Sequence, residues 1–186
     1  MTVQELSIRK VTLDTLPAVH ALVERCFRSK DAAKGWCSEA EFFTGARITP
    51  AGMLDKFQHP DTVFLAGYDR DPSSENKETL VTCCEIARRD PDTCYFGLFA
   101  VDPALQGGGV GSRVLREAER YAREELGCAR MEMQVIDRRD TLIAYYVRRG
   151  YARTEEKRPF PYELFGEGTI LRDDLQFAVL VKELTA

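Results

Sequence analysis

The sequence lacks the features that mark membrane, exported and zinc-binding proteins. It contains no run of about 18 apolar residues, which argues against a membrane-spanning helix. The opening MTVQELSIRK has no apolar core of the kind found in signal peptides. Histidine is scarce, with only His20 and His59 present, so a zinc site built from His and Cys ligands is not expected. We therefore expect a cytoplasmic protein without a metal.

An excess of positive charge is also missing. The 186 residues include 26 Lys and Arg against 30 Asp and Glu, a net charge of −4. This balance argues against a nucleic acid or an anionic membrane as partner. Six cysteines are present without the spacing of metal ligands: Cys26, Cys37, Cys83, Cys84, Cys94 and Cys128. We interpret them as buried free thiols rather than disulfides or metal ligands. Cys83 and Cys84 should point to opposite faces of a strand.

The pattern of apolar residues indicates one domain over residues 1–186, of the α/β (α+β) class. Runs rich in β-branched and apolar residues predict strands at 6–13, 62–69, 78–89, 92–103, 129–136, 151–156 and 175–184. Helical spacing predicts helices at 15–28, near 50–58, at 112–126 and at 140–149. The segment 158–174 is punctuated by Pro and Gly and is expected to be a loop. Together these elements predict a mixed sheet with helices packed on it.

The stretch QGGGVG at 106–111 stands between the predicted strand 92–103 and the predicted helix 112–126. Glycines before a helix allow a phosphate to approach the unpaired N–H groups of the first helical turn. We therefore favour a phosphate site over a purely structural turn. A Walker A loop is excluded because no lysine follows Gly111. The dinucleotide pattern G-x-G-x-x-G is also missed, since Ser112 occupies the place of the third glycine.

A different pattern, Q-x-x-G-x-G, fits Gln106, Gly109 and Gly111. Downstream, RDTLIAYYVRRGY places Tyr146 four residues before Gly150. Together these motifs resemble the GNAT superfamily of acetyl-CoA-dependent N-acetyltransferases over residues 93–156. The resemblance implies a GNAT fold with a single mixed, largely antiparallel sheet of about seven strands and helices on both faces. Segments 36–47 and 158–182 resemble a subset that acts mostly on small molecules.

The resemblance implies a set of residues that bind coenzyme A. The pyrophosphate would lie on the main chain from Gly107 to Ser112, and the pantetheine would pair with the main chain of Phe99 and Val101. A main-chain N–H near Ala100 or Val101 could stabilise the oxyanion. Asp140 stands where the superfamily often has Asn, and Asp cannot donate the same hydrogen bond. The full set is Phe99, Ala100, Val101, Gln106, Gly107, Gly108, Gly109, Val110, Gly111, Ser112, Asp140 and Tyr146.

The same resemblance makes Tyr146 the acid that protonates the departing thiolate, although a tyrosine on such a helix could also be a core aromatic. Glu85, within the apolar run LVTCCEIA, is the candidate general base. Its alternatives are Glu39, a water chain, or a solvated Glu85 with no catalytic role. Trp36, Glu39 and Arg47 are expected to wall the acceptor site. Trp36 could instead cap the core, and Arg47 could bind an acceptor carboxylate or pair with Glu39 or Glu41.

These expectations define an N-acetyltransferase that moves the acetyl group of acetyl-CoA to a primary amine of a small molecule by direct attack. The alternatives are a protein or peptide N-acetyltransferase, which would need an open acceptor groove, and a non-catalytic acyl-CoA-binding sensor. A homodimer is possible, because the apolar FAVLV at 177–181 could pair with a second copy.

Overall fold

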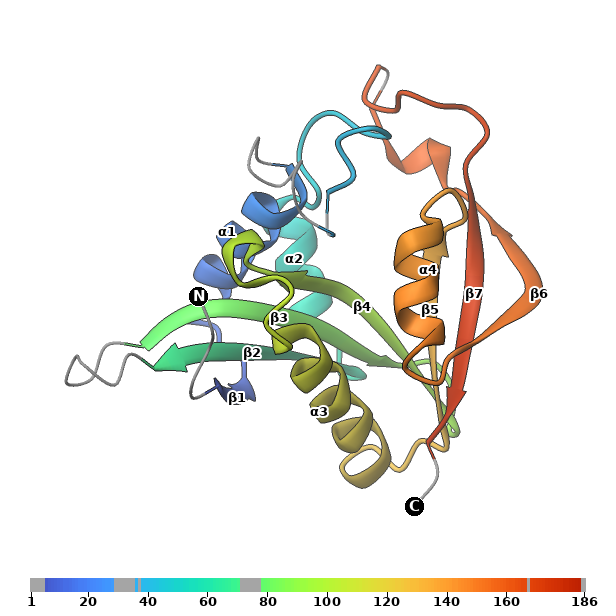
Figure 1. The fold of residues 1–186 in the computed structure, drawn as a ribbon. Helices are drawn as coiled ribbons and strands as arrows, with labels where there is room; N and C mark the ends of the chain where they lie inside the picture. The colour runs from blue at the N-terminus through green and yellow to red at the C-terminus, as the bar shows by residue number, and fades with distance from the viewer. Residues whose placement is uncertain (1–5, 29–35, 37, 71–77, 167, 185–186) are drawn as a thin grey trace.

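A computed structural model describes the chain except for residues 1–5, 29–35, 37, 71–77, 167 and 185–186. Its strands form one mixed sheet in the order β1-β2-β3-β4-β5-β7-β6. The strands are β1 (Leu6–Lys10), β2 (Thr62–Arg70), β3 (Glu78–Arg88), β4 (Thr93–Val101), β5 (Arg130–Ile136), β6 (Ala152–Pro159) and β7 (Gln176–Glu183). The α-helices are α1 (Leu16–Arg28), α2 (Pro50–Gln58), α3 (Val110–Glu124) and α4 (Asp140–Val147) (Figure 1).

The predicted order of strands and helices is confirmed, and two ends differ from the prediction by three residues. The first strand stops at Lys10 because the chain turns just after it: the Thr12 N–H donates to the Thr15 hydroxyl, and the Leu16 N–H to the Thr12 carbonyl. The strand predicted at 151–156 continues to Pro159, into the segment expected to be a loop. Its last residues stay extended because they pair with β7, where Pro159 lies opposite Gln176.

The sheet opens between its two central strands. All neighbouring strands pair antiparallel except β4 and β5, whose parallel pairing runs only from Thr93–Arg130 to Tyr95–Glu132. Beyond Tyr95 the two strands separate, as Figure 1 shows. A bulge in β4 accompanies this opening, where the register with β3 shifts between Gly97 and Ala100. Within the bulge, Leu98 has a φ of 40°, which is unusual for a residue with a side chain.

Both faces of the sheet are covered, as predicted. One core lies under α3 and α4 and contains Cys84, while the other lies under α1 and α2 and contains Cys83. The two adjacent cysteines therefore do point to opposite faces. The helix faces follow the predicted spacing: α3 buries Val110, Val114, Leu115, Ala118, Tyr121 and Ala122, and α1 buries Leu16, Val19, Leu22, Val23, Cys26 and Phe27.

A third, aromatic core joins two loops that lie far apart in the sequence. Phe43 stacks on Phe160 and Phe165 at ring-centroid distances of 5.4 and 5.6 Å. Phe43 also forms an isolated β-bridge with Ile170, and the Leu171 N–H donates to the Phe42 carbonyl over 2.8 Å. The loop that carries Phe42 and Phe43 and the loop that follows β6 are thereby held together above the open end of the sheet (Figure 1).

Two further sequence predictions concern β7 and the cysteines. β7 lies between β5 and β6 and is hydrogen-bonded on both sides, so the FAVLV segment is not an edge that could pair with a second copy. Five cysteines are buried free thiols, while Cys37 lies outside the described residues. Of the helices in the described part of the chain, none is long and apolar enough to cross a membrane.

Candidate active site

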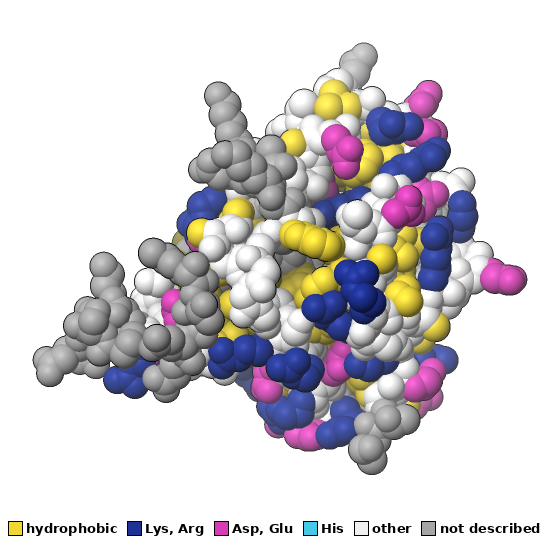
Figure 2. Space-filling model, in the orientation of Figure 1, with side chains coloured by type: hydrophobic (Ala, Val, Ile, Leu, Met, Phe, Trp, Pro, Cys, Tyr) yellow, Lys and Arg dark blue, Asp and Glu magenta, His cyan; other side chains and the backbone are white. Residues whose placement is uncertain are grey.

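A cavity of about 450 Å³ lies in the opening between β4 and β5. Gly97, Leu98, Phe99 and Val101 line it from β4, and Met133, Gln134, Val135 and Ile136 line it from β5. In Figure 2 this face of the molecule is hollowed near its centre, with hydrophobic side chains around the hollow and Lys or Arg side chains beside it. The cavity therefore follows from the early end of the β4–β5 pairing.

The glycine loop brings the start of α3 to one end of this cavity. Gly109 is the N-cap residue, with φ 81° and ψ −3°, a left-handed conformation that glycine adopts without strain. Nothing lies within 4 Å of the position that a Cβ would take at Gly107 or Gly109. Across the described residues, no hydrogen bond reaches the N–H groups of Val110, Gly111 or Ser112. These open N–H groups, with the helix dipole, provide the chemistry of an anion site.

Gly111 has a separate reason to be glycine. A Cβ there would lie 2.9 Å from the hydroxyl oxygen of Tyr145 and 3.3 Å from Cζ of Phe99. Its absence lets both aromatic side chains approach the first turn of α3. Gly111 therefore shapes the wall of the cavity beside the open N–H groups.

Gln106 links the end of β4 to the loop that walls the acceptor end. Its Nε2 donates to the Val101 carbonyl over 3.1 Å, and its Oε1 accepts from the Trp36 N–H over 2.6 Å. Gln106 also lines the cavity. Its amide thus orients both main-chain segments, and the Val101 carbonyl has a partner within the protein.

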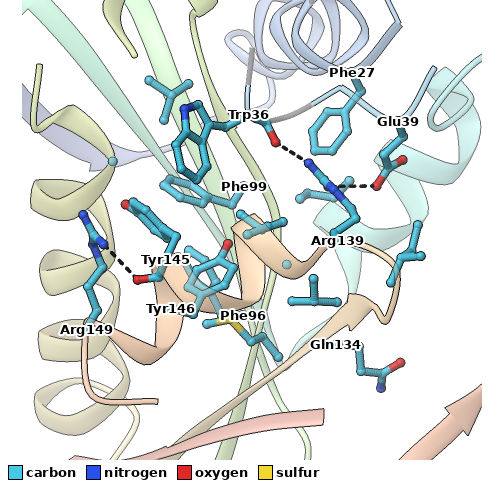
Figure 3. Close-up of a pocket in the computed structure, with 18 of the residues that line it drawn as sticks. Phe27, Trp36, Glu39, Phe96, Phe99, Gln134, Arg139, Tyr145, Tyr146 and Arg149 are labelled. Atoms are coloured by element: carbon cyan, nitrogen blue, oxygen red, sulfur yellow. Dashed lines mark hydrogen bonds and ion pairs between the residues drawn. The ribbon is translucent and has the colours of Figure 1, made fainter. Parts of the chain in front are cut away.

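The predicted acid, Tyr146, lies on α4 and lines the cavity with a side chain that is only 5% exposed. Its ring makes edge contacts with Tyr145 and Tyr151 at centroid distances of 5.2 and 5.9 Å. Figure 3 shows Tyr145 and Tyr146 side by side, with Phe96 and Phe99 of β4 next to them. Tyr146 is thus packed against other aromatic rings, as a core residue would be, and it also faces the cavity, as a catalytic acid must. Its position is compatible with both interpretations of the sequence.

The predicted base, Glu85, is buried on β3 and is not among the residues that line the cavity. Its Oε1 accepts from Lys56 Nζ over 2.7 Å, which excludes the alternative of a solvated glutamate. Its Oε2 lies 3.1 Å from the place of a Cβ on Gly97, a residue that does line the cavity. Burial, with the Glu85 charge nearby, raises the pKa of Tyr95. The missing side chain of Gly97 leaves the carboxylate close to the cavity wall.

The three predicted acceptor residues all line the cavity, with Trp36 beside Tyr145 and Glu39 on the side away from α3 (Figure 3). Trp36 is about half exposed, and its ring centroid lies 6.0 Å from that of Tyr145. Glu39 is buried, and its Oε2 lies 3.4 Å from Nε of Arg47. Trp36 therefore lines the cavity rather than capping a core. Arg47 forms the ion pair with Glu39 that was one of its predicted alternatives.

Four residues of the predicted cofactor set do not line the cavity: Ala100, Gly108, Val110 and Asp140. Ala100 and Val110 are buried in the two main cores, so only their main chain can face a ligand. Asp140 is exposed in the first turn of α4, where its charge is favourable to the helix dipole. Within the described residues, no group of three or more His, Cys, Asp or Glu side chains is arranged to hold a metal ion.

Sequence reasoning missed three arginines that line the cavity: Arg139, Arg148 and Arg149. Arg149 reaches the start of α3, where its Nη2 donates to the Ser112 hydroxyl over 2.7 Å. Its guanidinium lies over the Tyr145 ring, with Cζ 3.4 Å from the centroid (Figure 3). The paired arginines directly before Gly150 were the available signal, because they end the helix that carries Tyr146.

The opened mixed sheet with helices on both faces matches the fold of solved GNAT structures. The chain belongs to the acetyltransferase (GNAT) family, whose model matches residues 16–151. It is thus an acetyltransferase, and enzymes of this family use acetyl-CoA. No match to a curated, functionally described protein was found.

Solved structures support the fold assignment. A candidate phosphinothricin N-acetyltransferase has a TM-score of 0.68 and 17% identity, with 98% of this chain and 100% of that chain covered. A GNAT acetyltransferase from Elizabethkingia anophelis with acetyl-CoA bound has a TM-score of 0.63, 14% identity and coverage of 97% and 99%. Spermidine N-acetyltransferase from Vibrio cholerae, in complex with CoA and spermine, has a TM-score of 0.67, 12% identity and coverage of 96% and 95%. At these identities the likeness concerns the fold alone.

Proposed function

We propose that this acetyltransferase moves the acetyl group of acetyl-CoA to a primary amine of a small molecule by direct attack. The observation that carries the proposal is the cavity between β4 and β5, which joins the open N–H groups of α3 to the walled acceptor end. The similar structures are named for small amines such as spermidine, which supports the same class of acceptor.

The form of the acceptor end favours a small molecule over a protein. The loop that carries Phe43 and the loop that follows β6 are joined there by the Phe43–Ile170 bridge and by the stacked aromatic rings. Ile136 and Phe177 belong both to that aromatic core and to the cavity lining. An extended peptide would need a groove that runs between these loops, and the joined loops obstruct its path.

The residues at the α3 end fit coenzyme A. Its phosphates would lie against the N–H groups of Val110, Gly111 and Ser112, where Gly107 and Gly109 leave the approach open. Arg149, held on Ser112 and Tyr145, adds a positive charge beside these groups. Uncapped N–H groups and a cation give an anion site without any further rearrangement.

The chain's own residues then need to handle the protons of this exchange. Acetyl-CoA supplies an activated thioester, whose acetyl carbon forms the new C–N bond while the C–S bond breaks. The acceptor ammonium must lose one proton before attack, its nitrogen loses a second as the amide forms, and the departing thiolate must gain one, so that one proton is released overall. Tyr146 at the cavity is the proposed donor to the sulfur. Glu85, near the wall at Gly97, is the proposed acceptor of the ammonium proton.

The test is acetyl-CoA-dependent thiol release across a panel of small amines, with Tyr146→Phe as the key variant. We expect kcat to fall by about 10²- to 10⁴-fold, because a positioned proton donor contributes that range, while CoA affinity changes little. Tyr145→Phe is the matched control, since it removes a hydroxyl from the neighbouring ring in the same cavity. Tight CoA binding with no thiol release for any amine would favour the sensor instead.

A further inference from the structure

The acceptor end of the cavity holds more guanidinium groups than carboxylates. Glu39 is the buried carboxylate there, and three arginines surround it. Its distances are 3.2 Å to Nη1 of Arg28, 3.4 Å to Nε of Arg47 and 3.7 Å to Nη1 of Arg139. Figure 3 shows Arg139 between the Trp36 carbonyl and Glu39. One negative charge is thus shared among three positive charges.

Two of the three arginines are engaged by the protein itself. Arg28 donates to the carbonyl oxygens of Gly45 and Phe27 as well as to Glu39, and burial lowers its pKa. Arg139 donates to the Trp36 carbonyl. These contacts hold the loop that walls the acceptor end. Arg28 already donates to three oxygen atoms of the protein.

Arg47 is engaged differently. Its approach to Glu39 is an ion pair without hydrogen-bond geometry, and its Nε is a buried atom with no hydrogen-bond partner among the described residues. Its guanidinium is held over the Phe27 ring, with Cζ 5.2 Å from the centroid. The Arg47 side chain is 31% exposed, and neither its Nη1 nor its Nη2 makes a hydrogen bond to any other described residue. These N–H groups, rather than the buried Nε, are the ones that can donate to an oxyanion in the cavity.

The backbone at Arg47 is fixed independently of its side chain. Both oxygens of the Glu24 carboxylate accept from the Arg47 N–H, at 2.8 and 3.0 Å, and Oε1 also accepts from the Ile48 N–H at 2.9 Å. Glu24 is thereby occupied by main-chain donors. The Arg47 side chain is therefore presented to the cavity from a rigid position.

From these contacts we infer that the acceptor carries an oxyanion near its amine, bound by Arg47 with Arg139 beside it. This inference rests on the proposed small-amine acetyltransferase and names its substrate class: an amino acid or a similar amine bearing a carboxylate. At this end of the lining Glu39 faces Arg47 and Arg139, which disfavours a polycation. Phe27, Ile136 and Phe177 add an apolar wall that suits an apolar side chain.

The experiment compares amines that differ only in the anion. Acetyl transfer is measured with L-leucine against L-leucinamide, L-methionine against L-methioninamide, and 1,4-diaminobutane. Binding of the same compounds to the CoA-loaded protein is measured by calorimetry, which needs no turnover. The variants are Arg47→Met, Arg47→Lys, and Arg153→Met as a control, because Arg153 is an exposed arginine of β6 outside the cavity lining.

We expect each acid to exceed its amide by about ten- to hundredfold in kcat/KM, as a charge-assisted hydrogen bond provides. Arg47→Met should remove this preference through KM, Arg47→Lys should keep part of it, and Arg153→Met should behave as the parent chain. Amides or 1,4-diaminobutane used as well as the acids would overturn the inference, although the proposed function would stand. Binding of CoA without binding of any acid would also overturn it. Amine binding without any thiol release would instead contradict the proposed function.

Discussion

Replacing Gly109 by glutamate tests whether the start of α3 binds the phosphates of coenzyme A. Gly109 lines the cavity as the N-cap residue, next to the open N–H groups. A Cβ there would meet no atom within 4 Å apart from its chain neighbours, so a side chain can start into the approach to those groups without a clash. Gly109→Gln is the matched control, because it has the same shape and the same backbone strain but no charge.

Two effects of these variants can be separated by size. The φ of 81° is unfavourable for any residue with a Cβ, so both variants should lose about 1–2 kcal/mol of stability. In a chain of this length that corresponds to a melting temperature lowered by about 2–8 °C. Only glutamate repels the diphosphate. For the single glutamate charge against the two diphosphate charges, each at ~6 Å with an effective dielectric constant of about 40–80, Coulomb's law gives roughly 1.4–2.8 kcal/mol, or about ten- to hundredfold in Kd.

The assay is CoA binding by calorimetry for the parent chain and both variants, at low and high salt. We expect Gly109→Glu to bind CoA about ten- to hundredfold more weakly than Gly109→Gln, with the difference shrinking as salt screens the charges. Equal affinities for the two variants, at equal melting temperatures, would refute the phosphate assignment. The reasoning about the open N–H groups would then be wrong.

Three other predictions concern the core, the thiols and the candidate base. Phe160→Ala should lower the free energy of unfolding by about 3–5 kcal/mol, measured by denaturant titration, because Phe160 is a buried member of the aromatic core; a loss below 1 kcal/mol would contradict this. In a Cys37→Ser background the native protein should not react with a thiol reagent at pH 8, because burial raises the pKa of the Cys84 and Cys94 thiols; reaction before unfolding would contradict their burial. Glu85→Gln should slow acetyl transfer by about 10²- to 10⁴-fold at unchanged CoA affinity, and an unchanged rate would leave the proton to water.

The order of elements was predictable because each has a clear period in the sequence. Helix α3 presents apolar residues at helical spacing after a glycine loop, and β4 is almost continuously apolar, as expected of a strand covered on both faces. The candidate phosphate site was predicted from the same local order of strand, glycines and helix. Local sequence carries these features because their physical causes are local.

Features that depend on tertiary contacts were beyond the reach of the sequence. Leu98 adopts a positive φ although leucine disfavours it, so only the surrounding sheet can account for the bulge. Lys56 meets Glu85 from a different element, 29 residues away. Arg149 contacts Ser112, which lies 37 residues away in the sequence, on helix α3. Polar partners distant in sequence have no periodicity, so pattern analysis does not find them.

The charge of the whole chain conceals the charge of its site. The chain carries −4, yet the described charged residues that line the cavity are four arginines against one glutamate. Arg149 lies at the α3 end and Arg47 at the acceptor end, with Tyr146 also on the wall. Such a local field attracts anions in spite of the net charge, because nearby charges dominate inside a cavity. A cosubstrate with phosphates and an acceptor with an oxyanion would each find a cationic anchor. The amine and the thioester, which carry neither anion, would then lie between the two cationic anchors. The net charge of the chain does not indicate this arrangement, because it averages over the whole surface.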